Sequence, residues 1–167
     1  MENLPNAVEN SFYYSIDFAS HEESTLEDEI ETKEIEKILT DDFNLFESIE
    51  EKRKREEVLF KINSIVKAAI YNLAIKKGMS EEEAKVVDGK VFTFGSYRLG
   101  VTGPGDDIDV LCCGPNHADR KLFFEEMIYL LKKEREISEC FPIPDANVPI
   151  IKIIFSGIHI DLLIARL

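Results

Sequence analysis

The spacing of apolar residues changes near Asp88, and this change limits the folds open to the chain. Before Asp88, apolar side chains recur every three or four residues, as in the stripe through Val58, Ile62 and Ala69, which is the period of an amphipathic helix. After Asp88, short apolar runs separated by turn residues are typical of β-strands. Helices followed by strands, with one helix inserted, predict an α+β domain in which helices pack on a small mixed sheet.

The first part of the chain is predicted to form three helices. At Ser24 and at Ser80, a serine is followed three residues later by a glutamate, which is the capping pattern with which many helices begin. A long helix is expected over 45–77, because the segment 40–44 breaks the preceding periodicity and Gly78 suits the left-handed residue that ends many helices.

The second part contains one predicted helix, over 119–135, and five predicted strands. The strands are expected over 90–94, 108–113, 137–143, 148–155 and 158–165. Ser156 and Gly157 separate the last two strands, and such a pair between apolar runs is typical of a two-residue turn. We therefore expect the last two strands to form a hairpin.

The net charge of −13 arises in the N-terminal third of the chain. Residues 1–60 carry 18 acidic and 6 basic side chains, whereas residues 61–167 carry 15 acidic and 14 basic ones. This composition offers no basic face that could grip a nucleic-acid backbone, so any action on polyanions is expected to depend on metal ions or on additional parts. We expect an acidic, partly helical segment over 1–39 and a folded domain over 40–167.

Cysteine usage and hydropathy indicate the compartment. Two of the three cysteines are adjacent, and neighbours on a strand point to opposite faces, so the pattern favours a reducing intracellular environment over a disulfide framework. The most apolar stretch, 148–167, is interrupted by a lysine, a histidine and an aspartate, and is not predicted to span a membrane. The N-terminus lacks the basic start and apolar run of a secretory signal.

A glycine and a serine follow the first predicted strand, which ends at Phe94. If a helix begins at Gly95 and Ser96, free backbone N–H groups and a hydroxyl point outward there, as in proteins that hold phosphate oxygens. A Walker loop is excluded, since no Gly-Lys-Ser/Thr follows. An isolated Gly-Ser pair is more often a plain capped turn, so both interpretations stay open on this feature alone.

Two aspartates precede and enter the second predicted strand. Asp107 and Asp109 are two residues apart, so in an extended chain their carboxylates project from the same face. Carboxylates held so close repel each other unless a cation lies between them, and oxygen ligands suit Mg²⁺ or Mn²⁺. The alternative is a solvated strand entrance.

Asp161 is the third carboxylate of interest, because it lies in a run too apolar for an unpartnered charge. If its strand lies beside the strand over 108–113, Asp161 completes a cluster with the other two aspartates. Two metal ions held by such a cluster, near a phosphate-binding turn, form a site for in-line phosphoryl or nucleotidyl transfer.

Together these residues resemble the pattern of the polymerase-β-type nucleotidyltransferases. More narrowly, the segment 94–111 reads F-G-S-Y-R-L-G-V-T-G-P-G-D-D-I-D-V-L and closely resembles the catalytic domain of eukaryotic nuclear poly(A) polymerases. The same likeness is found in the segments P-N-H-A-D-R-K-L-F-F, V-P-I-I-K-I and G-I-H-I-D-L-L-I-A-R-L. The resemblance covers roughly 40–167, which would be the nucleotidyltransferase catalytic domain.

The resemblance implies roles for six residues. The carboxylates of Asp107, Asp109 and Asp161 would be the catalytic, metal-binding groups for two Mg²⁺ or Mn²⁺ ions, and would also contact ATP. Phe94, Gly95 and Ser96 would contact the incoming ATP, the last two at its phosphates. One metal ion would lower the pKa of the attacking hydroxyl, and the other would bind the triphosphate.

The implied reaction transfers AMP from ATP to an RNA 3′-OH and releases pyrophosphate, in mRNA 3′-end processing in the nucleus. ATP, the RNA 3′ end and mRNA 3′-end processing factors would be the partners, with no membrane involved. The family's central and RNA-binding domains do not follow Asp161 here, so the chain alone is expected to be weak or inactive. Two alternatives stay open: another RNA nucleotidyltransferase, such as a uridylyltransferase, and a non-catalytic binding protein that retains the fold.

Three other charged features receive mainly structural interpretations. The basic run 52–55 is flanked by glutamates and is expected to be a solvated, salt-bridged helix face. Asp106 is expected to face water. Lys152 on an apolar strand would either reach a substrate phosphate or extend its charge into solvent.

Overall fold

The computed structural model describes residues 22–115 and 118–166. Its elements follow in the order α1 (Leu26–Asp41), α2 (Ile49–Lys76), α3 (Glu81–Val86), β1 (Lys90–Phe94), α4 (Gly95–Leu99), β2 (Ile108–Gly114), α5 (Arg120–Leu131), β3 (Ile137–Ile143), β4 (Ile150–Phe155) and β5 (Ile158–Arg166). The predicted α+β class and all five predicted strands are confirmed. The helix predicted over 119–135 ends four residues earlier, at Leu131.

The first three helices begin at capping boxes, in two cases not at the predicted residue. α1 is capped by Thr25, which exchanges hydrogen bonds with Asp28, and not by Ser24. α2 begins after Ser48 and not at 45, because the Ser48 hydroxyl is the acceptor that satisfies an otherwise unpaired N–H of the first turn. α3 begins after Ser80, as predicted.

The five strands form one mixed sheet in the order β1-β2-β5-β4-β3. β2 and β5 are parallel, and the other pairs are antiparallel. The adjacency of the second and last strands, which is the condition for a cluster of Asp161 with Asp107 and Asp109, is thus present. So is the β4–β5 hairpin, in which Ser156 and Gly157 both have positive φ, 51° and 81°, as a two-residue turn of matching twist requires.

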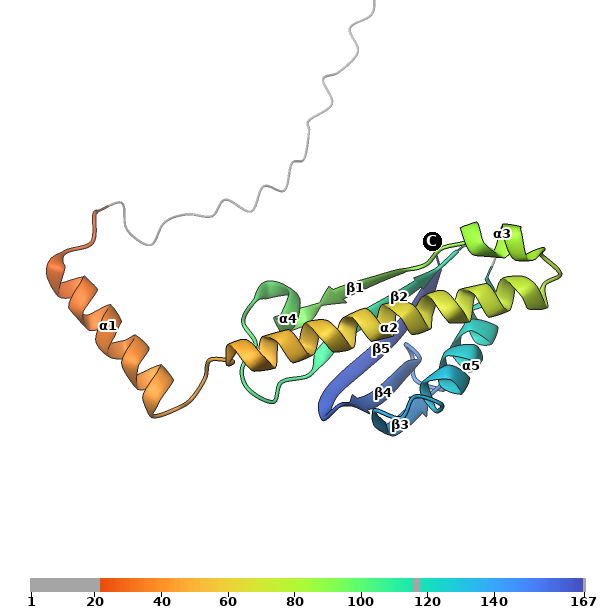
Figure 1. The fold of residues 1–167 in the computed structure, drawn as a ribbon. Coiled ribbons are helices and arrows are strands. Elements are labelled where there is room, and N and C mark those ends of the chain that lie inside the picture. Colours follow the sequence, from red (N-terminus) through yellow and green to blue (C-terminus); the bar gives the residue numbers. More distant parts are fainter. Residues whose placement is uncertain (1–21, 116–117, 167) are drawn as a thin grey trace, which may run out of the picture.

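Helices α2 and α5 cover one face of the sheet, and the core lies between them and the strands (Figure 1). The core residues of α2 and α5 include Val58, Ile62, Val66, Ala69, Ile70, Leu73, Phe123, Phe124, Met127 and Leu131. From the sheet, the alternate residues Ile108, Val110, Cys112, Ile151, Ile153, Phe155, Ile160, Leu162 and Ile164 face them. α2 is the one described helix long and apolar enough to cross a membrane, but Ile62 and Val66 are fully buried in this core.

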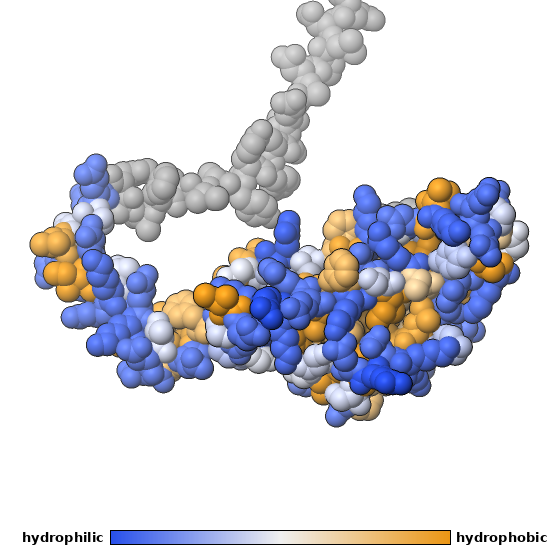
Figure 2. Space-filling model, viewed as in Figure 1, coloured by the Kyte–Doolittle hydropathy of each residue, from blue (hydrophilic) through white to orange (hydrophobic). Residues whose placement is uncertain are grey.

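α1 lies outside this core. None of its residues is buried, and its surface is mostly hydrophilic (Figure 2). The link from α1 to α2 carries exposed apolar side chains at Phe43, Leu45 and Phe46, and Figure 2 shows apolar surface near the start of α2. The parts that position the site are therefore the sheet, α2, α4 and the loop between α4 and β2.

Candidate active site

A row of five side chains crosses the sheet at one register level. Asp109 on β2 is paired with Phe94 on β1 and with Asp161 on β5. Asp161 is paired in turn with Lys152 on β4, and Lys152 with Phe141 on β3. Directly paired residues point to the same face of a sheet. Because the alternate residues are buried under α2 and α5, this row lies on the opposite face of the sheet, where Lys152 and Phe141 are exposed.

The charges in the row influence one another. Partial burial raises the pKa of Asp109, and the neighbouring carboxylates of Asp107 and Asp161 raise it further, against the opposing charge of Lys152. The three aspartates that the sequence singles out are thus electrostatic neighbours, and their mutual repulsion is the condition that a bound cation would relieve.

Asp161 takes its countercharge from Lys152. The Lys152 Nζ donates a hydrogen bond to Asp161 Oδ2 at 2.5 Å, with the lysine side chain 50% exposed and the aspartate 16% exposed. This hydrogen bond is the largest cause that raises the pKa of Lys152. The β4–β5 turn could have revealed this partner, because a two-residue turn at 156–157 places Lys152 opposite Asp161.

The donor set suits Mg²⁺ or Mn²⁺ in chemistry, since it consists of carboxylate oxygens on neighbouring strands. Within 22–115 and 118–166, however, no three His, Cys, Asp or Glu side chains are grouped closely enough to hold a metal ion together. The ion pair with Lys152 occupies one oxygen of Asp161. A shared coordination sphere would therefore require this lysine to leave Asp161.

The Gly-Ser turn lies directly beside the central carboxylate. β1 ends at Phe94, and Gly95 and Ser96 open the five-residue helix α4, as expected of a strand-to-helix turn. Gly95 has φ +65°, and a Cβ there would lie 2.2 Å from Asp109 Oδ2. Only glycine therefore fits at this position, for both its backbone conformation and the approach of Asp109.

A pocket of about 480 Å³ opens beside the row. Its polar lining includes Asp107, Lys152, Asp161 and His159. His159 precedes Asp161 by two residues on β5 and therefore shares its face. The pocket therefore brings two of the predicted carboxylates and one cation to a common solvent space.

A larger pocket, of about 580 Å³, lies between α2 and α5. Its buried carboxylate, Glu126, accepts hydrogen bonds from Asn72, at 2.8 Å, and from Lys76. A carboxylate that already has a countercharge and a hydrogen-bond donor needs no bound cation. The carboxylate row on the open face is therefore the stronger candidate for chemistry.

The sequence analysis missed a buried cluster behind the loop 100–107. Arg55 forms an ion pair with Glu47, and these side chains are only 4% and 2% exposed. The solvated interpretation of the run 52–55 is thus wrong for Arg55, although Arg53 does pair with exposed glutamates. Arg55 lies three residues before Val58, and this spacing places it on the buried stripe of α2. The burial of Arg55 could have been predicted from this spacing.

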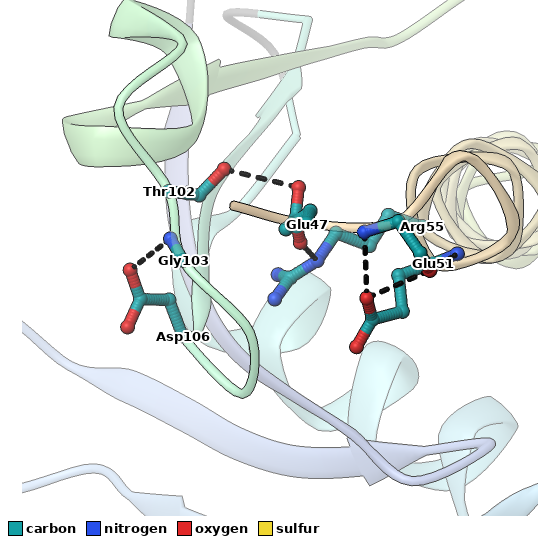
Figure 3. Close-up of polar contacts among 7 residues, drawn as sticks. Glu47, Glu51, Arg55, Thr102, Gly103 and Asp106 are labelled. Carbon is teal, nitrogen blue, oxygen red and sulfur yellow. Dashed lines mark hydrogen bonds and ion pairs between the residues drawn. The ribbon is translucent and has the colours of Figure 1, made fainter. Parts of the chain in front are cut away.

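The same loop is braced by Asp106. Its Oδ2 accepts a hydrogen bond from the Gly103 N–H at 2.8 Å (Figure 3), so this carboxylate does more than face water. Thr102, one residue earlier, donates a hydrogen bond to Glu47 Oε2 at 3.2 Å. The loop that leads to Asp107 is therefore held both internally and to the start of α2.

The fold superposes on those of solved structures. A structure of Cid1, described for its RNA terminal uridylyl transferase activity, superposes with a TM-score of 0.59 at 18% identity, over 79% of this chain and 37% of Cid1. The polymerase core of TRAMP, an RNA surveillance complex, gives 0.50 at 26% identity, over 72% of this chain and 33% of that one. The predicted nucleotidyltransferase fold is confirmed.

The family follows from the sequence. The profile of the poly(A) polymerase nucleotidyltransferase domain matches residues 19–167, and the chain belongs to this family. It is 54% identical to poly(A) polymerase of Dictyostelium discoideum over 125 residues, 75% of this chain and 16% of that protein. It is 48% identical to nuclear poly(A) polymerase 1 of Arabidopsis thaliana over 141 residues, 84% of this chain and 20% of that protein. The chain thus spans about a fifth of these relatives, and the match includes α1.

Proposed function

We propose that this chain is the catalytic domain of a poly(A) polymerase, which transfers AMP from ATP to the 3′-OH of RNA. The observation that carries the proposal is the register of Asp109 against Asp161 on the open face of the sheet, with Gly95 against the same aspartate. Family membership supports adenylate as the transferred group. A role in mRNA 3′-end processing in the nucleus, together with processing factors, belongs to the same proposal, and relatives named nuclear poly(A) polymerase support it.

The chemistry divides between the carboxylates and the turn. Asp107, Asp109 and Asp161 would hold two Mg²⁺ or Mn²⁺ ions, which when bound activate the attacking hydroxyl and stabilise charge on the leaving pyrophosphate. Gly95 and Ser96 would offer backbone N–H groups and a hydroxyl to the triphosphate oxygens, while Phe94 contacts the nucleotide. Each of these residues belongs to the row of paired side chains that crosses the sheet, or lies within two residues of it along the chain.

Lys152 would change partners during this reaction. In the structure its ammonium forms an ion pair with Asp161. This positive charge reduces the repulsion among the neighbouring carboxylates in the folded protein. If bound cations neutralised Asp161 instead, the ammonium of Lys152, which lines the same pocket, would be available to bind phosphate oxygens. The exposure of the lysine favours this exchange, since little desolvation opposes its movement.

The alternatives differ in the transferred nucleotide or in the absence of chemistry. Identity to poly(A) polymerases reaches 54%, whereas identity to the uridylyl transferase Cid1 is 18%, and this contrast favours adenylate. A purely structural binding module would not require three neighbouring carboxylates on one face, because such a group of like charges is unfavourable without a ligand.

The proposal is tested by primer extension. The chain, joined to the remaining length of the Dictyostelium relative, is incubated with labelled oligoadenylate, Mg²⁺ or Mn²⁺ and one nucleoside triphosphate at a time. We expect extension with ATP, little with UTP, and none by Asp109→Asn, while Asp88→Asn, an exposed carboxylate paired with Lys67, stays active. Preferential use of UTP would favour the uridylyl alternative, and unimpaired Asp109→Asn would refute the catalytic site.

A further inference from the structure

The buried cluster of Glu47, Arg55 and Thr102 connects the start of α2 to the loop 100–107 (Figure 3). Glu47 directly precedes the capping residue of α2, and Arg55 projects from the same helix. The guanidinium points towards the loop that carries Gly103 and Asp106. Buried charges are costly, so a sealed pair at this position calls for an explanation.

The pair does not line the pocket beside the carboxylate row. Arg55 instead borders a smaller pocket of about 290 Å³, which shares Gly105, Asp106 and His159 with the first one. Within the described residues, Arg55 Nη1 and Glu47 Oε1 are both buried without a hydrogen-bond partner, and Glu47 is the carboxylate that forms an ion pair with Arg55. The ion pair in turn fixes the Glu47 carboxylate. Its second oxygen accepts a hydrogen bond from the Thr102 hydroxyl.

The loop depends on this acceptor for its position. It has no regular secondary structure between α4 and β2, and its other described hydrogen bonds are local: from Gly100 to Tyr97, from Val101 to Ser96, and between Gly103 and Asp106. Gly103 also packs closely on the chain before α2, since a Cβ there would lie 3.3 Å from the Leu45 carbonyl oxygen. Thr102 is thus the point at which a side chain joins the loop to the helix.

We propose that Glu47, Arg55 and Thr102 are positioning residues, which hold the loop 100–107 so that Asp107 enters β2 in place to share a metal ion with Asp109 and Asp161. This inference rests on the proposed metal site. The ion pair orients Glu47, Glu47 orients Thr102, and Thr102 sets the path of the backbone five residues before Asp107. Outer groups that orient metal ligands typically change metal affinity by 10–100-fold when they are removed.

The test measures Mn²⁺ binding to the full chain by electron paramagnetic resonance. Thr102→Val keeps the size of the side chain and leaves the Glu47–Arg55 pair intact, but removes the hydroxyl. We expect it to weaken Mn²⁺ binding about tenfold with an unchanged melting temperature, and Thr102→Ser to restore binding. Thr40→Val is the matched control, because the Thr40 hydroxyl bonds to Glu36 on α1, away from the site; it should bind Mn²⁺ as the parent chain does.

Three other results would overturn the inference in distinguishable ways. If the parent chain binds Mn²⁺, Asp109→Asn loses that binding and Thr102→Val binds as the parent does, the metal site stands and the positioning role is refuted. If Asp109→Asn binds Mn²⁺ as well as the parent chain, the proposed metal site itself fails, and the positioning role fails with it. Equal losses in Thr102→Val and Thr102→Ser would likewise count against the hydroxyl.

Discussion

Gly95 and Asp109 lie so close together that a side chain on the glycine would collide with the aspartate. A Cβ on Gly95 would lie 2.2 Å from Asp109 Oδ2, and the glycine has φ +65°. The end of β1 and the central carboxylate of β2 are therefore mutually dependent. This contact explains why a glycine, and not merely a small residue, precedes the serine of the turn.

The first prediction concerns this contact. Gly95→Ala should displace Asp109 and abolish nucleotidyl transfer, and should lower the free energy of unfolding by about 1–2 kcal/mol for the left-handed backbone alone. Gly78→Ala is the matched control, because Gly78 has φ +87° with nothing within 4 Å. It should lose similar stability in urea unfolding but retain activity. Full activity of Gly95→Ala would contradict the close approach.

A second prediction concerns Asp109 and pH. Its raised pKa means that the ionised form opposes folding, so Asp109→Asn should slightly increase the free energy of unfolding at neutral pH. The sign follows from linkage: the penalty grows as pH rises above the ordinary value of 3.8 and is absent well below it. Urea titrations of both proteins across this range should converge at low pH. A gain that persists there would show that charge is not its cause.

Lys152 provides a third prediction. Lys152→Met removes the countercharge of Asp161, so the metal-free protein should lose about 1 kcal/mol or less of stability, the scale of a solvent-accessible ion pair. The rise in melting temperature on adding Mn²⁺ should become larger, since the cation then has no competitor. Lys61→Met, which breaks the pair with Glu136 elsewhere on the surface, should leave the Mn²⁺ response unchanged.

A fourth prediction concerns the buried Glu126 beneath α2. Burial raises its pKa, but hydrogen bonds from Lys76 and Asn72 outweigh this and hold the pKa below the ordinary value of 4.5. The ionised form therefore stabilises the fold above that value, and the stabilisation is lost as pH falls below it. Glu126→Gln should cost about 1–2 kcal/mol at neutral pH and nothing in strong acid. The exposed Glu136→Gln should have a smaller effect in the same thermal or urea unfolding.

Much of the fold was predictable because its signals are local. Period-two apolar runs and the 156–157 turn define the strands. A lone aspartate in the last strand indicated that it needs a partner, and the pairing of β5 with β2 brings Asp161 beside Asp109. Even the partner of Lys152 was implied by the length of that turn. In contrast, α2 begins at Ile49 rather than at 45, because the cap formed by Ser48, and not the apolar spacing, determines where the helix starts.

The candidate site was less predictable where it depends on the loop 100–107. Nothing in a periodic pattern indicates how such a segment packs, so the contact of Thr102 with Glu47 could not be foreseen. Arg55 was predicted to be solvated because its neighbours in the run 52–55 are charged. Its position on the buried stripe of α2 is not evident from those neighbours. Burial of a single charged side chain depends on its tertiary partner, and that partner lies outside the run.

The register row has a consequence for how the site can change during evolution or design. The row takes one residue from each strand, and neighbouring strands lie about 4.8 Å apart. A side chain in the row can therefore be replaced without changing the distance between the strands. The alignment of the row depends on the register of the strands. One residue more in the Ser156–Gly157 turn would turn Lys152 to the buried face or shift Asp161 away from Asp109. The hairpin turn has no role in binding substrate in the proposed reaction. Its residues can therefore be replaced more readily than its length can be changed.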